Sequence, residues 1–494
     1  MSFHHGTRVD IALLFAAMFG ILALYADTLN PFQRLNRVKR PFHTTTTDGT
    51  ILLTRKFTLT VRTALWWKLF AYYKCAWHIV SNVRAGSKAK GRTLDAIIGD
   101  IHRLRFDPRK PYLISGDHFN VLYPRNLGVF YHATLDAHTA LSETDWSNRQ
   151  RIYLQTVAYA LETFSALGDC TTTIVPVGPT AVCPVNIYRY PSDALYGILY
   201  SIASLCGTPG PYNHYFSDTP TFKLGTIDST KKLLDDHRAS ITQLLQRYYE
   251  RVYDETSGLV RTNVALASAK DAVLRESSFY DNVILWKTFS LAADLGFAIP
   301  KSLDLAELKS NILAAFWSEE AGHFIDDLST ESRTEASYSA DWLVAHFTGF
   351  LDAHDPSERR YLQRATDYTI EHELDMPFPL RYQETNRSHN EVLLVRLVVP
   401  AYGGSAIWSF WGAEFIKLLI VLSRFEHSTA YRERARSHIA TYERNIATYK
   451  GYPEVYDTKG VMLRTLLYKS VRQTGWVVGF EQARQLLRSA DLHS

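Results

Sequence analysis

The chain has 494 residues, enough for a large folded core, and its 46% hydrophobic and 21% charged residues are typical of a globular protein. This composition excludes an intrinsically disordered tail and a collagen-like fibre. The 54 basic and 50 acidic residues are spread along the chain, so the net charge of +4 predicts no nucleic-acid partner. Aromatic residues are abundant at 13%, which suits a packed core and also stacking against flat rings such as sugars.

An uncharged run from Ile11 to Ala26 follows a short head that carries Arg8. The run is near the lower length limit for a membrane span and also fits the apolar region of a signal peptide. We therefore expect residues 1–40 to be a membrane anchor or signal segment, with the membrane as a partner through residues 11–26 and the main domain extracytoplasmic. Four basic residues favour the opposite orientation by the positive-inside rule: Arg34, Arg37, Lys39 and Arg40. A buried N-terminal helix is the alternative.

Residues 41–62 are rich in Thr and β-branched side chains and contain the turn pair Asp48-Gly49, so they predict a short β-hairpin or linker. From residue 63 to 494 helical periodicity dominates and predicts one helical domain. The expected helices are 63–84, 93–105, 127–141, 149–167, 192–206, 229–254, 279–295, 303–317, 338–353, 357–374, 405–425, 429–448, 460–470 and 478–490.

A short motif marks the end of two of these helices. It runs from Tyr253 to Val260 and again from Trp317 to Phe324, with an aromatic residue, an acid and a Gly in register, and a fainter copy starts at Tyr456. The unit predicts a helix end, a Gly turn with positive φ and a short extended piece. Helical hairpins repeated at this interval bury their inner faces only against one another. About six of them would close into an all-α (α/α)6 toroid; an irregular helical domain is the alternative.

Toroids carry function in the loops at one end, and three loops concentrate polar and aromatic residues. The first, Ser115–Gly128, offers candidates for binding a substrate, either by polar contacts or by stacking: Asp117, Phe119, Tyr123 and Arg125. The simpler interpretation of this loop is a well-bonded turn that caps the next helix.

The second loop, Ser268–Trp286, places Glu276 and Asp281 where a helix should begin. A carboxylate in a first turn can serve only as a cap, because it satisfies free N–H groups. With Arg275 beside it and Trp286 following, Asp281 could instead be a carboxyl held protonated next to a sugar, as a general acid requires.

The third loop, Gly451–Asp457, holds Glu454 between Tyr452 and Tyr456 in a turn fixed by Pro453. A loop Glu is usually solvated, but this frame favours a partly desolvated carboxylate able to activate water. Two acids on separate loops of one barrel end are the arrangement that glycoside hydrolysis requires.

These segments resemble a known family. Segment 276–282 (ESSFYDN) resembles the E-S-G-x-D-N-S-P-R segment of inverting six-hairpin glycosidases, the group of processing α-glucosidases, mannosylglycerate-type hydrolases and trehalases. The resemblance implies that Asp281 is the general acid and that Glu454, which matches the family's late Glu, is the general base. Segment 402–408 is similar to the family's Y-x-G-x-x-W loop, which lines the sugar site, and implies a role for Trp408.

The chain departs from the family pattern at several positions. One residue is inserted between Ser277 and Asp281, and Val283-Ile284 replace the family's Ser-Pro. Arg125-Asn126 stands where similar enzymes often have Arg-Asp, which leaves the sugar open. Glu276 is the next candidate for the acid if Asp281 does not fill that role. The aromatic residues expected as sugar platforms, or else as core, are Phe119, Tyr123, Trp286, Trp342, Trp408, Trp411, Tyr452 and Tyr456.

The sequence therefore predicts an inverting glycoside hydrolase that acts on an α-linked glucoside or a related glycan and uses no metal or cofactor. The four cysteines form no CxxC pair and predict no zinc site, while a Cys170–Cys183 bridge stays open if the domain is exported. Two alternatives remain. One is a polysaccharide lyase on the same toroid, with roles for His118, Asn120, Tyr123 and Arg125; the other is a non-catalytic glycan-binding protein of the envelope.

Overall fold

The computed structural model places most of the chain beyond residue 58. It describes residues 44–47, 50–53, 59–84, 87–107, 112–114, 116, 121–136, 139–140, 142–178, 181–186, 189–208, 210, 212, 224–270, 273–386, 391–466 and 468–492. The expected membrane segment at 11–26 lies outside these residues. Within them, no helix is long and apolar enough to cross a membrane.

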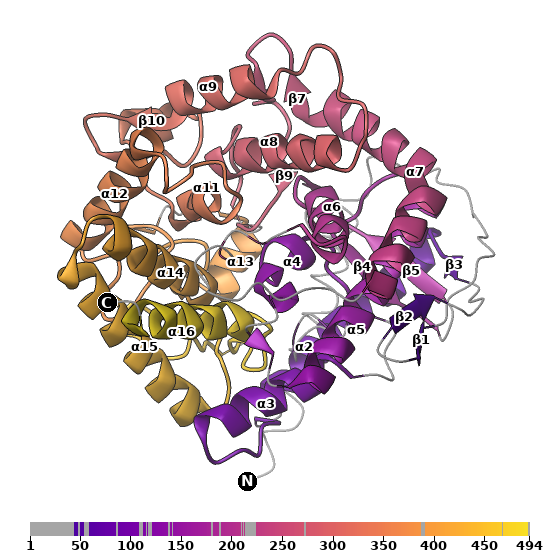
Figure 1. Cartoon of the computed structure of the whole chain (residues 1–494), viewed down its shortest axis with the longest axis horizontal. Helices are drawn as coiled ribbons and strands as arrows, with labels where there is room; N and C mark the ends of the chain where they lie inside the picture. The colour runs from indigo at the N-terminus through magenta and orange to yellow at the C-terminus, as the bar shows by residue number, and fades with distance from the viewer. Residues whose placement is uncertain are drawn as a thin grey trace.

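The body of the molecule consists of two concentric rings of helices (Figure 1). The outer ring contains α3 (Leu94–Arg105), α5 (Glu143–Leu167), α7 (Leu224–Val252), α9 (Leu305–Phe316), α12 (Pro356–Glu371) and α15 (Thr429–Tyr449). The inner ring contains α4 (Arg125–Gly128) with the 3-10 helix η1 (His132–Leu135), α6 (Ala194–Leu205), α8 (Phe279–Asp294), η4 (Ala340–Leu343) with α11 (Val344–Phe347), α14 (Ser409–Phe425) and α16 (Val477–Leu492).

Contacts between neighbouring inner elements close the ring. Helix α6 contacts α4 and α8, α8 contacts α11, η4 contacts α14, and α16 joins α14 to η1. Each inner helix also follows an outer one along the chain, as in a series of helical hairpins. The (α/α)6 toroid predicted from the repeat is thus confirmed.

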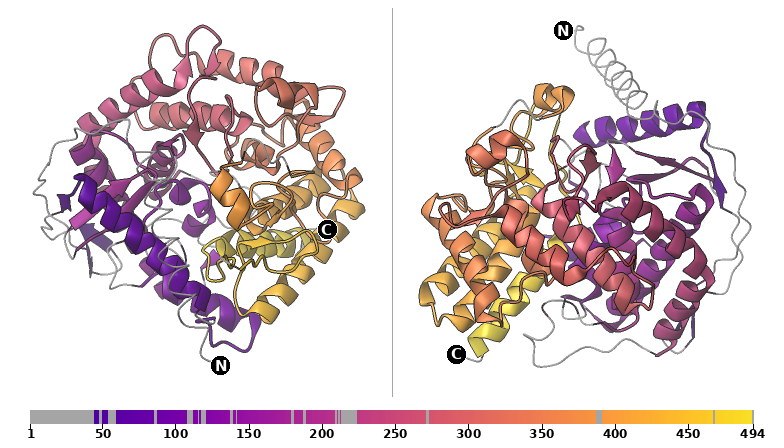
Figure 2. Two further views of the ribbon diagram at one scale, coloured as in Figure 1. Left: turned by 180° about the vertical axis from the view of Figure 1, so that it is seen from behind. Right: turned by 90° about the horizontal axis from the view of Figure 1, so that it is seen from above.

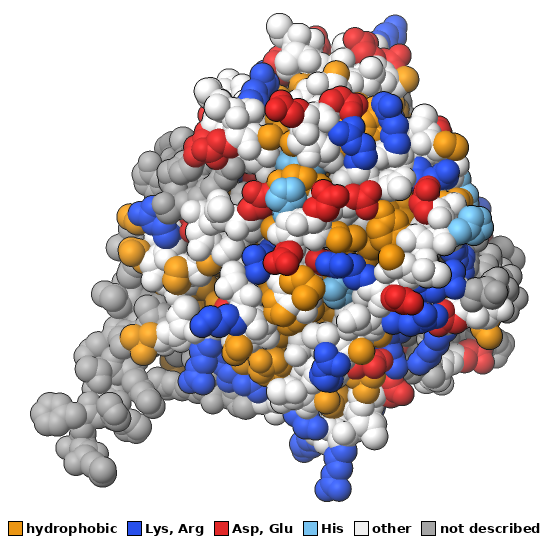
Figure 3. Space-filling view, turned by 90° about the vertical axis from the view of Figure 1, so that its left-hand side faces the viewer, with side chains coloured by type: hydrophobic (Ala, Val, Ile, Leu, Met, Phe, Trp, Pro, Cys, Tyr) orange, Lys and Arg blue, Asp and Glu red, His pale blue; other side chains and the backbone are white. Residues whose placement is uncertain are grey.

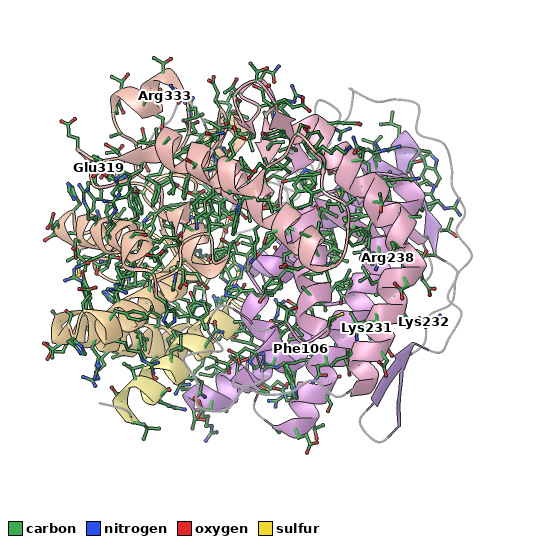
Figure 4. The ribbon with its side chains drawn as sticks, turned by 45° about the horizontal axis from the view of Figure 1, so that its top comes forward. Phe106, Lys231, Lys232, Arg238, Glu319 and Arg333 are labelled. Atoms are coloured by element: carbon green, nitrogen blue, oxygen red, sulfur yellow. The ribbon has the colours of Figure 1, made fainter. Side chains whose placement is uncertain are left out.

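The inner and outer helices differ in how much of their surface is buried. Every residue of α6 is buried, because an inner helix packs against its neighbours on all sides and is apolar all round. The outer wall carries charged residues on its solvent side, such as Lys232 on α7 and Glu319 after α9 (Figure 4). On the wall that carries α12 and α15, acidic and basic side chains are interspersed (Figure 3).

The repeated motif forms matching hairpins. Strand β7 (Tyr253–Asp254) pairs with β8 (Leu259–Val260) and β10 (Trp317–Ser318) pairs with β11 (His323–Phe324), both antiparallel. Gly258 and Gly322 make the turns at φ of 65° and 76°, in the left-handed region that glycine adopts without steric cost. Each hairpin ends an outer helix and sends the chain toward the start of the next inner helix.

The N-terminal hairpin is confirmed, since β1 (Thr44–Thr47) pairs antiparallel with β2 (Thr50–Leu53). A three-stranded sheet follows that the sequence did not predict: β3 (Thr60–Val61) pairs parallel with β5 (Ala181–Val185), which pairs antiparallel with β4 (Thr173–Pro176). Helix α2 (Leu65–Arg84) packs on this sheet. The fold is therefore mostly helical, but not all-α.

Other short elements lie in the loops. They are β6 (Tyr190–Pro191) paired with β9 (Leu266–Ala267), β12 (Ile407–Trp408) paired with β13 (Val455–Tyr456), α10 (Thr330–Thr334) and α13 (Leu393–Val398).

Two expectations from the sequence are wrong, and one possibility that the sequence leaves open is not realised. The helix expected at 460–470 is an extended segment, because Met462 pairs with Tyr456 across the Gly460 turn. The helix expected at 127–141 is broken into α4 and η1. The Cys170–Cys183 bridge does not form, and all four cysteines are free. Cys183 is buried with α2 against the sheet, whereas Cys170 belongs to the main core.

Candidate active site

The loops that lead into the inner helices meet at one end of the ring. Because each inner helix runs opposite to the outer helix before it, all inner helices begin at the same end. Contacts between these loops support the geometry: Ser192, before α6, bonds Asp281 of α8, and Ser409, at the start of α14, donates to the Glu454 carbonyl in the loop before α16. Helix N-termini favour negative charge, so carboxylates gather at this end.

Asp281 lies in the first turn of α8 and its carboxyl is held by two serine hydroxyls. Ser192 Oγ donates to Oδ1 and Ser278 Oγ to Oδ2, each at 2.5 Å. Ser278 is also the N-cap of the helix and accepts the Asp281 backbone N–H. Burial raises the pKa of Asp281, opposed by the charge of Arg275 and by the two serine bonds. Asp281 also adds to the burial effect that raises the pKa of Tyr248 on α7, so its carboxyl lies near this outer helix.

A buried ion cluster lies next to Asp281. Arg275 Nη1 bonds Asp326 Oδ1 at 3.0 Å and Asp341 Oδ2 at 2.6 Å, while Lys270 Nζ bonds Asp326 Oδ2 at 2.8 Å. Burial opposes ionisation of Asp326, but the two cations outweigh it and lower its pKa. All four side chains are buried. The cluster therefore holds paired charges, whereas the bonds that Asp281 accepts from side chains of the described residues come from two hydroxyls.

A second set of polar contacts links this cluster to the neighbouring inner helices. Arg125, the first residue of α4, donates to the Ser268 carbonyl and lies 3.6 Å from Asp193 Oδ1. Asp193 Oδ2 accepts from the Tyr280 hydroxyl at 3.1 Å. Arg125 is thus held within the protein by Asp193, which also accepts from Tyr280, the residue before Asp281.

Glu454 lies on the other side of the ring, in the loop that precedes α16. Its carboxylate is partly exposed and accepts from the Tyr468 hydroxyl at 3.4 Å. Burial raises the pKa of Tyr131, Arg105 opposes this, and the Glu454 charge adds to it. Glu454 therefore lies near Tyr131, which receives a hydrogen bond from Asn126, the neighbour of Arg125.

Aromatic rings form a wall beside Glu454. Tyr402 packs edge-on against Trp408 and near Tyr468, and Trp408 stacks on Trp476 with ring centroids 5.6 Å apart. The Trp408 indole N–H donates to the Tyr402 carbonyl at 2.8 Å. Tyr402 and Tyr468 are partly exposed, so they, more than the buried Trp408, offer ring faces at the surface.

Most other expected platforms are core residues. Trp286 lies between α8 and α9, where its N–H donates to the Leu305 carbonyl. The fully buried residues are Trp342, Trp411, Tyr452 and Tyr456. These four side chains have no open ring face and therefore pack in the core, whereas Trp286 is partly buried against it.

The remaining predicted residues divide into two groups. Glu276 is exposed, and Tyr123 packs against the cluster beneath α2. Asp117 and Phe119 lie outside the described residues, as do His118 and Asn120, which the lyase alternative requires.

Sequence reasoning missed Lys270, Asp326 and Asp341 of the ion cluster, and it also missed Glu391. A signal for Asp341 is present: Ser337 and Asp341 before α11 stand in the same spacing as Ser277 and Asp281 at α8. Glu391 has no such signal. Its Oε1 accepts from the Gly403 N–H at 3.2 Å, and burial raises its pKa.

No metal site is apparent in the part of the chain that the structure describes. No group of three or more His, Cys, Asp or Glu side chains there is arranged to hold a metal ion. The acids of the site are instead bonded to Lys, Arg and hydroxyl groups.

Comparison with known proteins identifies the fold. No family model and no curated protein match the sequence. Among solved structures, a glucoamylase from Saccharomycopsis fibuligera matches 81% of this chain and 96% of its own, with a TM-score of 0.51 and 11% identity.

Two further structures are similar at lower TM-scores. A mannosylglycerate hydrolase from Thermus thermophilus has a TM-score of 0.48 and 11% identity, over 80% of this chain and 99% of its own. A rhamnosidase from Klebsiella oxytoca has a TM-score of 0.47 and 13% identity, over 83% of this chain and 66% of its own. The chain shares the six-hairpin toroid fold of the glucoamylase, and the solved structures similar to it are six-hairpin glycosidases.

Proposed function

We propose that the chain is a glycoside hydrolase that cleaves an α-linked glucoside or related glycan with inversion, with Asp281 as general acid and Glu454 as general base. The observation that carries the proposal is the pair of carboxyls on opposite sides of one ring end, in contrasting environments. The glucoamylase that shares the fold supports the same class of reaction, since inverting and retaining glycosidases both work with two carboxyl groups.

The environment of Asp281 suits a proton donor. A general acid must be protonated when it meets the substrate, and burial raises the pKa of this carboxyl. Its hydroxyl partners on Ser192 and Ser278 can either donate to the ionised form or accept from the neutral one. Proton transfer to a leaving oxygen requires one hydroxyl to turn away, and Ser192, on a different loop, is free of the capping role of Ser278.

The environment of Glu454 suits a base. Its carboxylate is partly exposed and reaches solvent, where a water molecule can approach. Tyr468 donates to one of its oxygens and orients the group. Tyr402 and Tyr468 offer the aromatic faces on which a sugar ring packs.

The ring geometry is compatible with inversion. Helices α8 and α16 are separated by two inner elements in either direction. Packed helix axes lie about 8–10 Å apart, so opposite members of the ring lie about 16–20 Å apart. An inverting pair needs a separation of about 6.5–9.5 Å for substrate and water, so within this span both carboxyls have to turn toward the ring axis when substrate binds.

The test compares two α-glucosides, one with an alkoxide leaving group and one with a dinitrophenolate, which leaves without protonation. Asp281→Asn should lower kcat on the alkyl substrate by about 1,000-fold. On the dinitrophenyl substrate, whose leaving group needs no proton, the same variant should lose much less activity. Glu454→Gln should lose activity equally on both. Glu276→Gln, an exposed acid of the same loop, is the matched control and should retain activity.

Other outcomes identify a different assignment. If Asp281→Asn has a lower unfolding temperature but the same relative activity on both substrates, Asp281 is a cap only. If Glu391→Gln shows the leaving-group dependence instead, the buried Glu391 is the donor. Turnover that is indifferent to Asp281, Glu391 and Glu454 would contradict the proposal.

A further inference from the structure

Helix α2 carries an exposed apolar stripe on the outside of the molecule. Trp66 is 59% exposed and Trp77 is 54% exposed, although large aromatic residues are usually buried. Their spacing along α2 places them on one face together with the other exposed apolar residues of this helix: Leu65, Leu69, Phe70 and Tyr73. We refer to these six side chains as the α2 face.

The opposite side of α2 is fixed to the protein. Ala71, Tyr72 and Cys75 are buried against Val175 and Cys183 of the sheet. The Tyr72 hydroxyl donates to the Asn186 carbonyl at 3.2 Å, and Lys74 Nζ donates to the Pro176 carbonyl at 2.5 Å. The α2 face is therefore rigidly presented rather than left over from a loosely packed helix, and α2 lies along the edge of the molecule (Figure 2).

The chemistry of this surface fits a bilayer interface. Trp and Tyr with basic neighbours are the residues that settle at the headgroup level of a membrane. Helix α2 contains no acidic residue. Between residue 28 and α2 the sequence has seven basic residues against Asp48 alone, a balance that attracts anionic lipid: Arg34, Arg37, Lys39, Arg40, Arg55, Lys56 and Arg62.

The position of α2 in the chain points to the same occupant. The uncharged run Ile11–Ala26 precedes it, and only residues 27–64 separate the two. A segment of that composition partitions into lipid, so a bilayer that receives it would lie close to α2. Continuous apolar surfaces on soluble proteins mark interaction sites, and here both the charge and the neighbouring sequence favour lipid over protein.

We propose that the α2 face lies in the interfacial region of an anionic lipid bilayer, parallel to its plane. This proposal is independent of the glycosidase proposal. Docking would also turn one end of the toroid toward the membrane, because strands β4 and β5 beneath α2 belong to the segment between α5 and α6, which contains Ser192. The opening of the candidate site would then lie beside the lipid surface.

Site-directed spin labelling of the full chain tests the proposal. Labels are placed at Trp66→Cys and Trp77→Cys on α2, and at Lys232→Cys on the exposed face of α7 as the matched control. Cys206→Ser removes the one native cysteine that is not buried. The protein is bound to vesicles of phosphatidylcholine and phosphatidylserine, and collision rates are measured with oxygen, which enriches in lipid, and with a nickel chelate, which stays in water.

At positions 66 and 77 we expect an oxygen-to-nickel collision ratio about 10-fold or more above that at position 232 when vesicles are present, and no difference without vesicles. Equal ratios at all three positions on vesicles would overturn the proposal. Shielding of positions 66 and 77 from nickel in the absence of vesicles would also overturn the proposal. If the spectra then show spin–spin broadening, the α2 face contacts a second copy of the chain. If they show none, the α2 face contacts another segment of the same chain. Two label positions guard against one substitution that disturbs the helix.

Discussion

Asp281 and Asp341 show how the partners of a side chain decide its chemistry. Both residues lie in the first turn of consecutive inner elements. Asp341 is bonded to Arg275 at 2.6 Å and also accepts from Ser339, so its negative charge is compensated. Among the described residues, Asp281 accepts from the hydroxyls of Ser192 and Ser278, and burial raises its pKa. Of the two, Asp281 is the carboxyl suited to donate a proton.

The serine bond gives a testable pH dependence. The Ser192 hydroxyl stabilises the ionised form of Asp281 and so opposes the rise of its pKa. Ser192→Ala removes this bond, and the pKa of Asp281 should rise further. Because a general acid works in its protonated form, the alkaline limb of kcat/KM against pH should move to higher pH. A limb that stays in place, or moves to lower pH, would show that Asp281 does not set it.

The N-terminal ends of the inner helices could be predicted from local sequence. The distant residues that bond the polar side chains near these ends could not. Ser278 with Asp281 predicts a helix start from sequence alone, and the structure confirms Ser278 as the N-cap. Lys270 carries no local signal because its partner Asp326 is distant in the chain. For Trp411 the sequence leaves a sugar platform and a core position open, because an indole in a helix carries no local signal for the side it faces; the structure buries it.

At the scale of elements, the repeated hairpin is the most informative pattern in the sequence. It predicts a positive φ at Gly258 and Gly322, and both residues adopt it. Segment 460–470 misleads because its apolar spacing fits a helix, while pairing of Met462 with Tyr456 holds it extended. The sheet β3-β5-β4 escapes prediction as a whole because β3 comes from a segment more than a hundred residues before β4 and β5, and no local pattern reveals that pairing.

The turn glycines give a stability prediction. A Cβ at Gly322 would meet only the Arg364 guanidinium, at 3.6 Å, so Gly322→Ala tests backbone conformation and not crowding. We expect a loss of about 1 kcal/mol, the cost of placing alanine in the left-handed region. Gly178→Ala is the control, since a Cβ there makes an ordinary contact with Ala181 and φ is not in the left-handed region. The prediction fails if urea unfolds both variants at the same midpoint.

At the scale of the whole molecule, a buried polar network joins the last inner helices to the first inner element. Lys417 of α14 bonds Glu414 at 2.6 Å and Gln482 of α16 at 2.8 Å. Glu414 lies 3.5 Å from His132 of η1, and Gln482 bonds Asp136 at 2.7 Å. Burial lowers the pKa of His132 to about 4, with Glu414 opposing the shift. Lys417 Nζ also lies 3.3 Å from His132 Nε2, which can accept from the ammonium only when the ring is neutral.

This network predicts that the protein loses stability in mild acid. His132 titrates near pH 6.5 when unfolded, so the unfolded chain takes up a proton that the folded chain excludes. The stabilisation is present above about pH 6.5 and is lost as the pH falls toward 4, by at most about 3 kcal/mol from this residue.

Urea unfolding between pH 7.5 and 5 measures the slope. His132→Gln should be less stable than the wild type at neutral pH and should show a shallower decline in acid. His354→Gln, at an exposed histidine, should keep the wild-type slope. A decline in His132→Gln as steep as in the wild type would assign the acid sensitivity to other groups.

The central claim is hydrolysis with inversion between two carboxyls, and proton NMR of the first anomer released tests it most directly. The full chain is incubated with an α-linked glucoside, and spectra are recorded before the product mutarotates. We expect the β-anomer first, because water attacks from the face opposite the leaving group. Release of the α-anomer first would contradict inversion, and an unsaturated product from a uronate polymer in place of hydrolysis would move the assignment to a lyase.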